Sequence, residues 1–151
     1  MTFLGIDPGI SGGLAILYEG TFDPTVYAFK DMTVRDIVDC LRGIPIGEHG
    51  SFAMLESVHS FPGQGVASSF KFGQHFGQLI GILAGSGIAY DLVSPQKWQK
   101  ELGCLSKGDK NITKAAAQRL FPSVKVTHAI ADALLLAEFC RRTVKQRNGH
   151  I

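Results

Sequence analysis

Three carboxylates occupy positions where a charged side chain is costly. Asp7 directly follows the apolar residues 3–6, Glu56 follows the apolar residues 52–55 in the same way, and Asp132 lies within the apolar run 129–137. A carboxylate in such surroundings needs a basic partner or a cation, and no lysine or arginine lies within one helical turn of Asp132. An oxygen-rich cluster suits Mg²⁺ or Mn²⁺. A pair of these ions supports in-line hydrolysis of a phosphodiester.

Each of these residues also has a simpler interpretation. Asp7 before Pro-Gly is typical of an Asx turn, and Glu56 can cap the loop that follows it. His128 precedes Asp132 by four residues, so the two project from one face of a helix. It could ligate a metal, act as general base on the attacking water, or have no chemical role. The three carboxylates taken together favour a catalytic metal site.

The elements that must position these residues form an alternating pattern. Short apolar runs predict strands at 3–7, 14–18, 25–29, 52–56 and 88–93. Helices are expected after Thr33, over 66–84, after Ser94-Pro95, over 110–120 and from Thr127 to about 145, with Thr33, Ser94 and Thr127 as N-caps. The order of elements indicates an α/β fold with a mixed sheet.

Length and composition point to one ordinary globular domain over residues 1–151. The chain is 45% hydrophobic and 19% charged, which argues against intrinsic disorder. Residues 146–151 are expected to form a disordered tail. No apolar stretch is long enough for a membrane span, and three widely spaced cysteines fit no disulfide framework. We therefore expect a protein of a reducing, cytoplasmic compartment.

Charge is distributed unevenly along the chain. Residues 1–96 carry four basic side chains against nine acidic ones, whereas residues 97–151 carry eleven against four. This excess is typical of a surface that binds a polyanion, and a lysine-rich solvated surface is the alternative.

Three motifs resemble those of RuvC-like Holliday junction resolvases, within the ribonuclease H-like superfamily. In chain length and motif spacing, the sequence resembles the phage-type members of this family. Leu-Gly-Ile-Asp-Pro-Gly at 4–9, with Gly-Gly-Leu-Ala at 12–15, resembles their first-strand motif. Met-Leu-Glu-Ser-Val at 54–58 resembles the second acidic motif, and Ala-Asp-Ala-Leu at 131–134 the C-terminal helix motif. Actin-like and sugar-kinase-like ATPases also use a first-strand Asp-x-Gly, but they need a duplicated domain and a longer chain.

The resemblance implies a five-stranded mixed sheet of order 3-2-1-4-5, flanked by helices. It also implies a homodimer that nicks two opposed strands of a four-way DNA junction, with two Mg²⁺ ions per active site, replaceable by Mn²⁺, and no small-molecule substrate. Asp7, Glu56 and Asp132 carry over as metal ligands. Bacterial members commonly place a fourth ligand at the position of Ala129, whereas the candidate here is His128, at a position where phage-type members often have Asp.

A DNA-binding surface is expected after the fifth strand. Its candidate residues are Lys97, Lys100, Lys107, Lys110 and Lys114. The resemblance suggests that Phe61 is a wedge at the junction centre, and packing on the core is the alternative. We interpret Trp98 as a packing residue, and Phe70, Phe72 and Phe76 as core or dimer-interface residues. Arg141, Arg142, Lys145 and Arg147 either extend the basic surface or only favour the helix C-terminus.

Three functions fit these features. The first is a crossover junction endodeoxyribonuclease. The second is a nuclease with a broader range of branched DNA substrates, such as flaps and forks. The third is a junction-binding protein whose cleavage is weakened because His128 stands where an acid is common.

Overall fold

A single mixed sheet forms the centre of the computed structural model, which describes residues 1–47 and 49–149. Its strands are β1 (Thr2–Asp7), β2 (Gly13–Tyr18), β3 (Thr25–Ala28), β4 (Ser51–Glu56) and β5 (Ala89–Val93). They lie in the order β3-β2-β1-β4-β5. The pairs β1–β2 and β2–β3 are antiparallel, and β1–β4 and β4–β5 are parallel. The strand order expected from the resemblance is confirmed.

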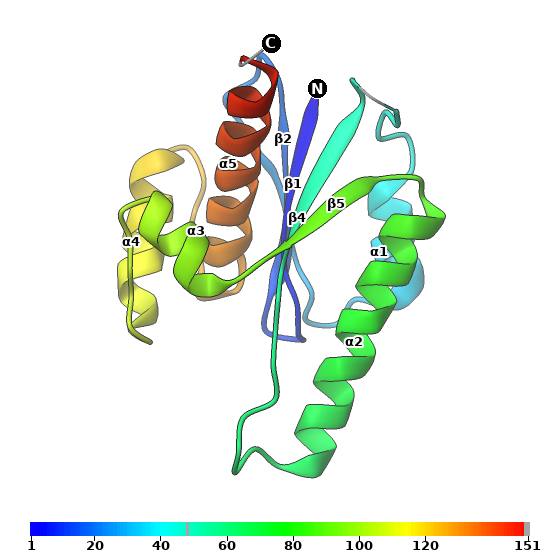
Figure 1. The fold of residues 1–151 in the computed structure, drawn as a ribbon, viewed down its shortest axis with the longest axis vertical. Helices are drawn as coiled ribbons and strands as arrows, with labels where there is room; N and C mark the ends of the chain where they lie inside the picture. Colours follow the sequence, from blue (N-terminus) through cyan, green and yellow to red (C-terminus); the bar gives the residue numbers. More distant parts are fainter. Residues whose placement is uncertain (48, 150–151) are drawn as a thin grey trace.

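Helices cover both faces of the sheet (Figure 1). The helices α1 (Val34–Leu41) and α2 (Val66–Gly85) lie on one side. The helices α3 (Pro95–Glu101), α4 (Lys110–Leu120) and α5 (His128–Asn148) lie on the other. The described part of the chain has no helix both long and apolar enough to cross a membrane.

Local sequence signals explain where several helices begin. Thr33 caps α1 through a reciprocal capping box with Asp36. The Ser94 side chain accepts a hydrogen bond from the backbone of Lys97, and Pro95 opens α3. The Asp109 side chain caps α4. These contacts confirm the caps predicted at Thr33 and Ser94, whereas Thr127 occupies the N-cap position of α5 without a side-chain hydrogen bond.

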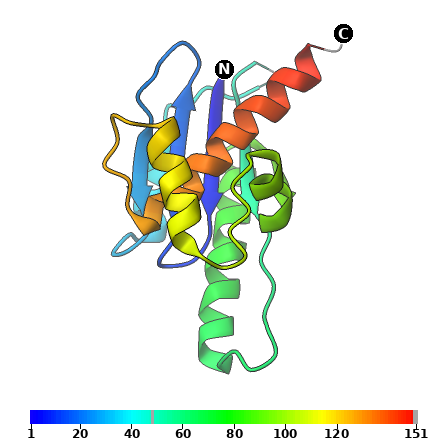
Figure 2. The ribbon, with the colours of Figure 1, turned by 90° about the vertical axis from the view of Figure 1, so that its left-hand side faces the viewer.

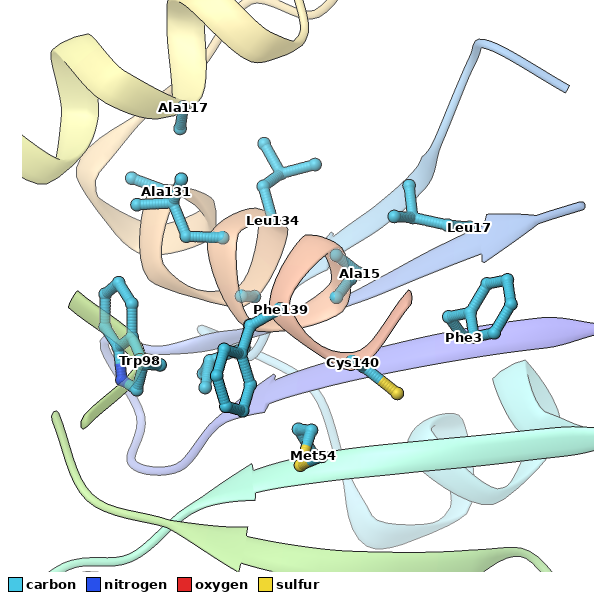
Figure 3. Packing of buried hydrophobic residues seen from close by; sticks show 14 of the residues in the cluster. Phe3, Ala15, Leu17, Met54, Trp98, Ala117, Ala131, Leu134, Phe139 and Cys140 are labelled. Atoms are coloured by element: carbon cyan, nitrogen blue, oxygen red, sulfur yellow. The ribbon is translucent and has the colours of Figure 1, made fainter. Parts of the chain in front are cut away.

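Alternation along the strands produces a hydrophobic core on each side of the sheet. Leu4 and Ile6 of β1 join the cluster beneath α1 and α2, whereas Phe3 faces the cluster beneath α3, α4 and α5. Figure 3 shows the second cluster, in which Trp98 of α3 lies beside α5. The period-2 pattern of the strands therefore anchors both helical layers.

Close packing fixes α5 against the central strand. The helix α5 contacts β1, β2 and β4. At Gly5 of β1, an added Cβ would lie 2.1 Å from the backbone nitrogen of Ala137 and 2.2 Å from the carbonyl oxygen of Ala133. Only glycine allows this approach, so α5 has a defined position over β1.

One expectation needs correction, and another is narrowed to one of its alternatives. The helix α5 continues to Asn148, so residues 146–148 are helical instead of forming a disordered tail, and residues 150–151 lie outside the described residues. Phe70 is 72% exposed, which excludes packing in the core and leaves the dimer-interface alternative. It lies in the N-terminal half of α2, which extends beyond the sheet (Figure 2).

Candidate active site

Asp7 and Glu56 lie at the same edge of the sheet. They are the last residues of β1 and β4, which run parallel. The preceding residues, Ile6 and Leu55, are register partners. Because parallel strands end at a common edge, this register brings the two carboxylates together. Their position at the carboxyl ends of strands is also where ligands commonly bind in α/β sheets.

Asp132 approaches the same edge from above the sheet. It lies in the second turn of α5, the helix that Gly5 allows to rest directly on β1. The negative charges of Glu56 and Asp132 both act on Asp7. The fold therefore brings together the three carboxylates that the sequence places far apart.

Burial and mutual repulsion disfavour the charged forms of these acids. Burial raises the pKa of Asp7 well above its ordinary value, and the charges of Glu56 and Asp132 add to this effect. Burial also raises the pKa of Glu56 to about 7, against the lowering effect of a hydrogen bond from Trp98. The pKa of Asp132 is raised, again mainly by burial. Raised pKa values of this kind are typical of carboxylates at functional sites, where a bound cation would stabilise the charged form.

The donor set fits a hard divalent cation. The Oδ1 atom of Asp132 is buried and has no hydrogen-bond partner, and a buried acceptor without a partner is costly unless a ligand satisfies it. All three carboxylates offer oxygen, which Mg²⁺ and Mn²⁺ prefer. Across residues 1–47 and 49–149, however, no group of three or more His, Cys, Asp or Glu side chains has the spacing of a ready-made metal site. Cation binding would therefore have to draw these carboxylates closer together.

Lys110 and Thr113 of α4 flank the acidic cluster. The charge of Lys110 lowers the pKa of Asp7, Glu56 and Asp132, opposing the effect of burial on each. The buried Thr113 hydroxyl, which donates to the carbonyl oxygen of Lys110 at 3.3 Å, lies near Asp132 and lowers its pKa further. The first turn of α4 thus supplies a positive and a polar group beside the acids.

His128 is the first residue of α5 and is exposed. Its charge has a small lowering effect on the pKa of Asp132, which lies one turn further along the helix. The two side chains are therefore near neighbours, as the spacing predicts. Whether His128 ligates a cation or accepts a proton remains a hypothesis for mutagenesis.

The expected DNA-binding lysines lie on α3, α4 and the segment between them. Lys97 and Lys100 are on α3, and Lys110 and Lys114 on α4. Lys107 lies in the connecting turn with a positive φ of 50°. Among the five, only Lys110 acts on all three acids.

Phe61 is 74% exposed in the loop between β4 and α2. Its backbone N–H donates to the side chain of Gln64 (3.2 Å), and the Gln64 N–H donates to the Phe61 carbonyl oxygen (3.0 Å). The ring does not pack on the core, which leaves it available for a ligand. Phe72 and Phe76 of α2 are half-buried.

The arginines near the end of α5 are engaged within the protein. Arg141 and Arg142 form ion pairs of 2.6 and 2.7 Å with Glu138, which is only 3% exposed. Arg147 pairs with Asp91 at 2.8 Å. These arginines compensate carboxylates of the fold, so the C-terminal part of the basic surface is weaker than the sequence suggests.

Trp98 and His75 were not identified from the sequence as neighbours of the site. The Trp98 indole N–H donates to Glu56 Oε2 at 2.7 Å. The Gly9 N–H, two residues after Asp7, donates to His75 Nδ1 at 2.9 Å. Both contacts join residues more than 40 positions apart, so no local sequence pattern predicts them. The one available signal was that Trp98 is the only tryptophan and follows a helix cap.

The fold is RuvC-like: a five-stranded mixed sheet flanked by helices, as in ribonuclease H-like proteins. One similar solved structure is Thermus thermophilus RuvC in complex with a Holliday junction substrate, with a TM-score of 0.66, 17% sequence identity, and coverage of 95% of this chain and 96% of that one. Another is a structure of Thermus thermophilus RuvC (TM-score 0.64, 18% identity, 95% and 97% coverage). No protein-family model and no curated protein sequence matches the chain.

Proposed function

We propose that this protein is a metal-dependent endonuclease that resolves four-way DNA junctions. The observation that carries the proposal is the meeting of Asp7, Glu56 and Asp132 at one sheet edge, where each carboxylate is buried enough to have a raised pKa. In a RuvC-like fold, this cluster is the part of the molecule best suited to chemistry on a phosphodiester.

Asp7, Glu56 and Asp132 would hold the cation, with His128 as a further candidate ligand. Mg²⁺ bound there would supply charge stabilisation and a water of lowered pKa. Asp132 offers its unpartnered Oδ1, and Glu56 keeps Oε1 available while Trp98 engages Oε2. As the alternative to a ligand's role, His128, exposed at the start of α5, would accept a proton from water.

The positive groups beside the acids support DNA as the substrate. Lys110, whose charge acts on Asp7, would contact a phosphate next to the scissile bond, and Lys107 lies three residues before it in the connecting turn. Lys97, Lys100 and Lys114 would extend this contact along the backbone. The neighbouring RuvC structure contains a Holliday junction substrate, which supports branched DNA over plain duplex.

Phe61 would act where the junction strands separate. An exposed aromatic ring on a loop next to a nuclease site can stack on an unpaired base, and such stacking is worth about 1–3 kcal/mol per base. The loop begins directly after Glu56, and Phe61 and Glu56 line one shared cavity.

Symmetric nicking of two opposed strands would require two active sites, and hence a homodimer. The part of α2 that extends beyond the sheet supports this arrangement, because Val66 and Phe70 are exposed there. Gly73, Gly77 and Gly81 have no atom outside their own helix within 4 Å of an added Cβ, so a second helix could approach closely.

Cleavage of synthetic DNA tests the proposal. The wild-type protein with Mg²⁺ should introduce paired symmetric nicks in a four-way junction and act weakly on a flap or a duplex. Asp7→Asn should still bind the junction but should not nick it. Nicking that survives in Asp7→Asn would remove Asp7 from the chemistry.

The two alternative functions have distinct outcomes in the same assay. Comparable nicking of flaps and forks would identify a broader branched-DNA nuclease. Tight junction binding by the wild type without nicking would identify a junction-binding protein. The second outcome has one observation in its favour, namely that the described carboxylates are not spaced as a ready-made metal site.

A further inference from the structure

We propose that Trp98 is a positioning residue that fixes the orientation of the Glu56 carboxylate through its indole N–H. The proposal rests on the proposed function, because it assigns Glu56 a ligand's role. It goes beyond that function in naming the side chain that holds Glu56 in place and the oxygen that remains for the cation.

The contact joins a rigid donor to a carboxyl oxygen. Nε1 of Trp98 lies 2.7 Å from Oε2 of Glu56, a short distance for an N–H···O bond. The Trp98 side chain is 0% exposed. Water therefore does not compete for the indole N–H, whose only hydrogen-bonding capacity is one donor.

The fold fixes Trp98 from two directions. Its backbone follows β5 directly, since Val93 pairs with Glu56 and α3 begins at Pro95. Its ring packs in the cluster beneath α5 with Leu134 and Phe139 (Figure 3). A ring held this way cannot follow Glu56 if that side chain rotates, so Glu56 must adapt to the ring.

The consequence is a carboxylate with two unequal oxygens. Oε2 is engaged by the indole, so Oε1 is the oxygen left to bind a cation, and Glu56 would act as a one-oxygen ligand. Partners of this kind orient metal-binding side chains, and their loss typically costs 10–100-fold in metal affinity. A packing role alone would carry no such cost.

The first test needs no metal and no DNA. The chain has one tryptophan, so a ¹H–¹⁵N spectrum contains a single indole N–H signal. Glu56→Gln should move this signal strongly, because it replaces the carboxyl group that accepts the indole hydrogen bond with an amide. His128→Ala, which alters an exposed residue of the same site, should leave it nearly unchanged. An indole signal indifferent to Glu56→Gln would overturn the proposal.

The second test measures Mn²⁺ binding by calorimetry without DNA. Trp98→Phe keeps most of the ring and removes the donor, and it should weaken Mn²⁺ binding by about 10-fold or more. In a Glu56→Gln background, Trp98→Phe should weaken Mn²⁺ binding no further, because Trp98 acts on the metal only through the Glu56 carboxylate. Additive losses in the double variant would contradict the proposal.

A matched core variant separates positioning from packing. Phe121 is 7% exposed in the same cluster, so Phe121→Leu should lower stability without changing Mn²⁺ affinity. If Trp98→Phe does not fold, replacement of the indole by benzothiophene keeps the shape and removes only the N–H. Equal loss of Mn²⁺ affinity in the Trp98 and Phe121 variants would show that Trp98 acts only through core packing.

Failure of this proposal is distinguishable from failure of the proposed function. A protein that nicks junctions, requires Glu56 and shows no indole response overturns only the role of Trp98. A protein whose Glu56→Gln variant nicks normally overturns the assignment of Glu56 as a ligand, and the role of Trp98 with it.

Discussion

Nδ1 of His75 accepts a hydrogen bond of 2.9 Å from the backbone N–H of Gly9. The contact ties α2 to the turn that follows Asp7. Gly9 has a φ of 103°, and an added Cβ would lie 2.6 Å from the Phe72 ring. This turn is therefore held by α2 at two points, and the helix stabilises the loop that presents Asp7.

Acid should weaken this contact. Burial lowers the pKa of His75, so the unfolded chain takes up a proton before the folded protein does. The contribution of His75 to the free energy of unfolding is complete above about pH 6.5 and is lost as the pH falls through the lower folded pKa. His75→Asn keeps an acceptor near the position of Nδ1 and does not titrate. Its urea-unfolding free energy should fall less than that of the wild type between pH 8 and 5.5, whereas parallel curves would show that His75 contributes no pH dependence.

Glu56→Gln should stabilise the metal-free protein at neutral pH. The pKa of Glu56 is raised from 4.5 to about 7, so between these values the folded state holds a proton that the unfolded state has released. The free energy of unfolding therefore falls as the pH rises through this range, by about 3 kcal/mol at most. Chemical denaturation at pH 5 and pH 8 should show this loss in the wild type and a smaller one in the variant. A variant less stable than the wild type at pH 8 would contradict this electrostatic account.

Lys110→Ala should weaken junction binding and reduce nicking by about tenfold or more. Loss of one phosphate contact should also lower the slope of log K against log salt by about one. Lys145 is a matched control, because it lies 3.8 Å from Glu19 and away from the acids. Binding measured by fluorescence anisotropy at several salt concentrations checks both variants. Equal effects of the two substitutions would indicate a general charge effect in place of a local contact.

Gly5→Ala should destabilise the protein by about 3 kcal/mol or more, because the added methyl group collides with the backbone of α5. It should also displace Asp132 from Asp7. Gly85→Ala provides the contrast: it ends α2, outside the three glycines assigned to the dimer, and its Cβ meets nothing within 4 Å, so the helix should gain up to about 0.5–1 kcal/mol. Thermal unfolding of the two variants gives both values. Tolerance of Gly5→Ala would mean that α5 does not rest directly on β1.

Local patterns predicted the elements well because the relevant forces act over a few residues. The strand ends at Asp7 and Glu56, the capping box at Thr33 and the Ser94-Pro95 helix start are all encoded in neighbouring positions. The sheet order came from the resemblance and not from these patterns.

The contacts that refine the site could not be predicted in this way. The bonds from Trp98 to Glu56 and from Gly9 to His75 depend on how layers pack across the sheet. The exposure of Phe70 depends on how far α2 extends beyond the sheet, which hydrophobic content alone does not reveal.

The ion pairs at the far end of α5 change how a polyanion would meet this protein. Glu138 holds Arg141 and Arg142, and Asp91 holds Arg147, so two carboxylates offset most of the three positive charges at this end of the helix. The lysines of α3 and α4 then dominate the long-range field at the opposite end of α5. Such a one-sided field orients an approaching strand before contact, so encounters would begin with the phosphates already turned toward the acids.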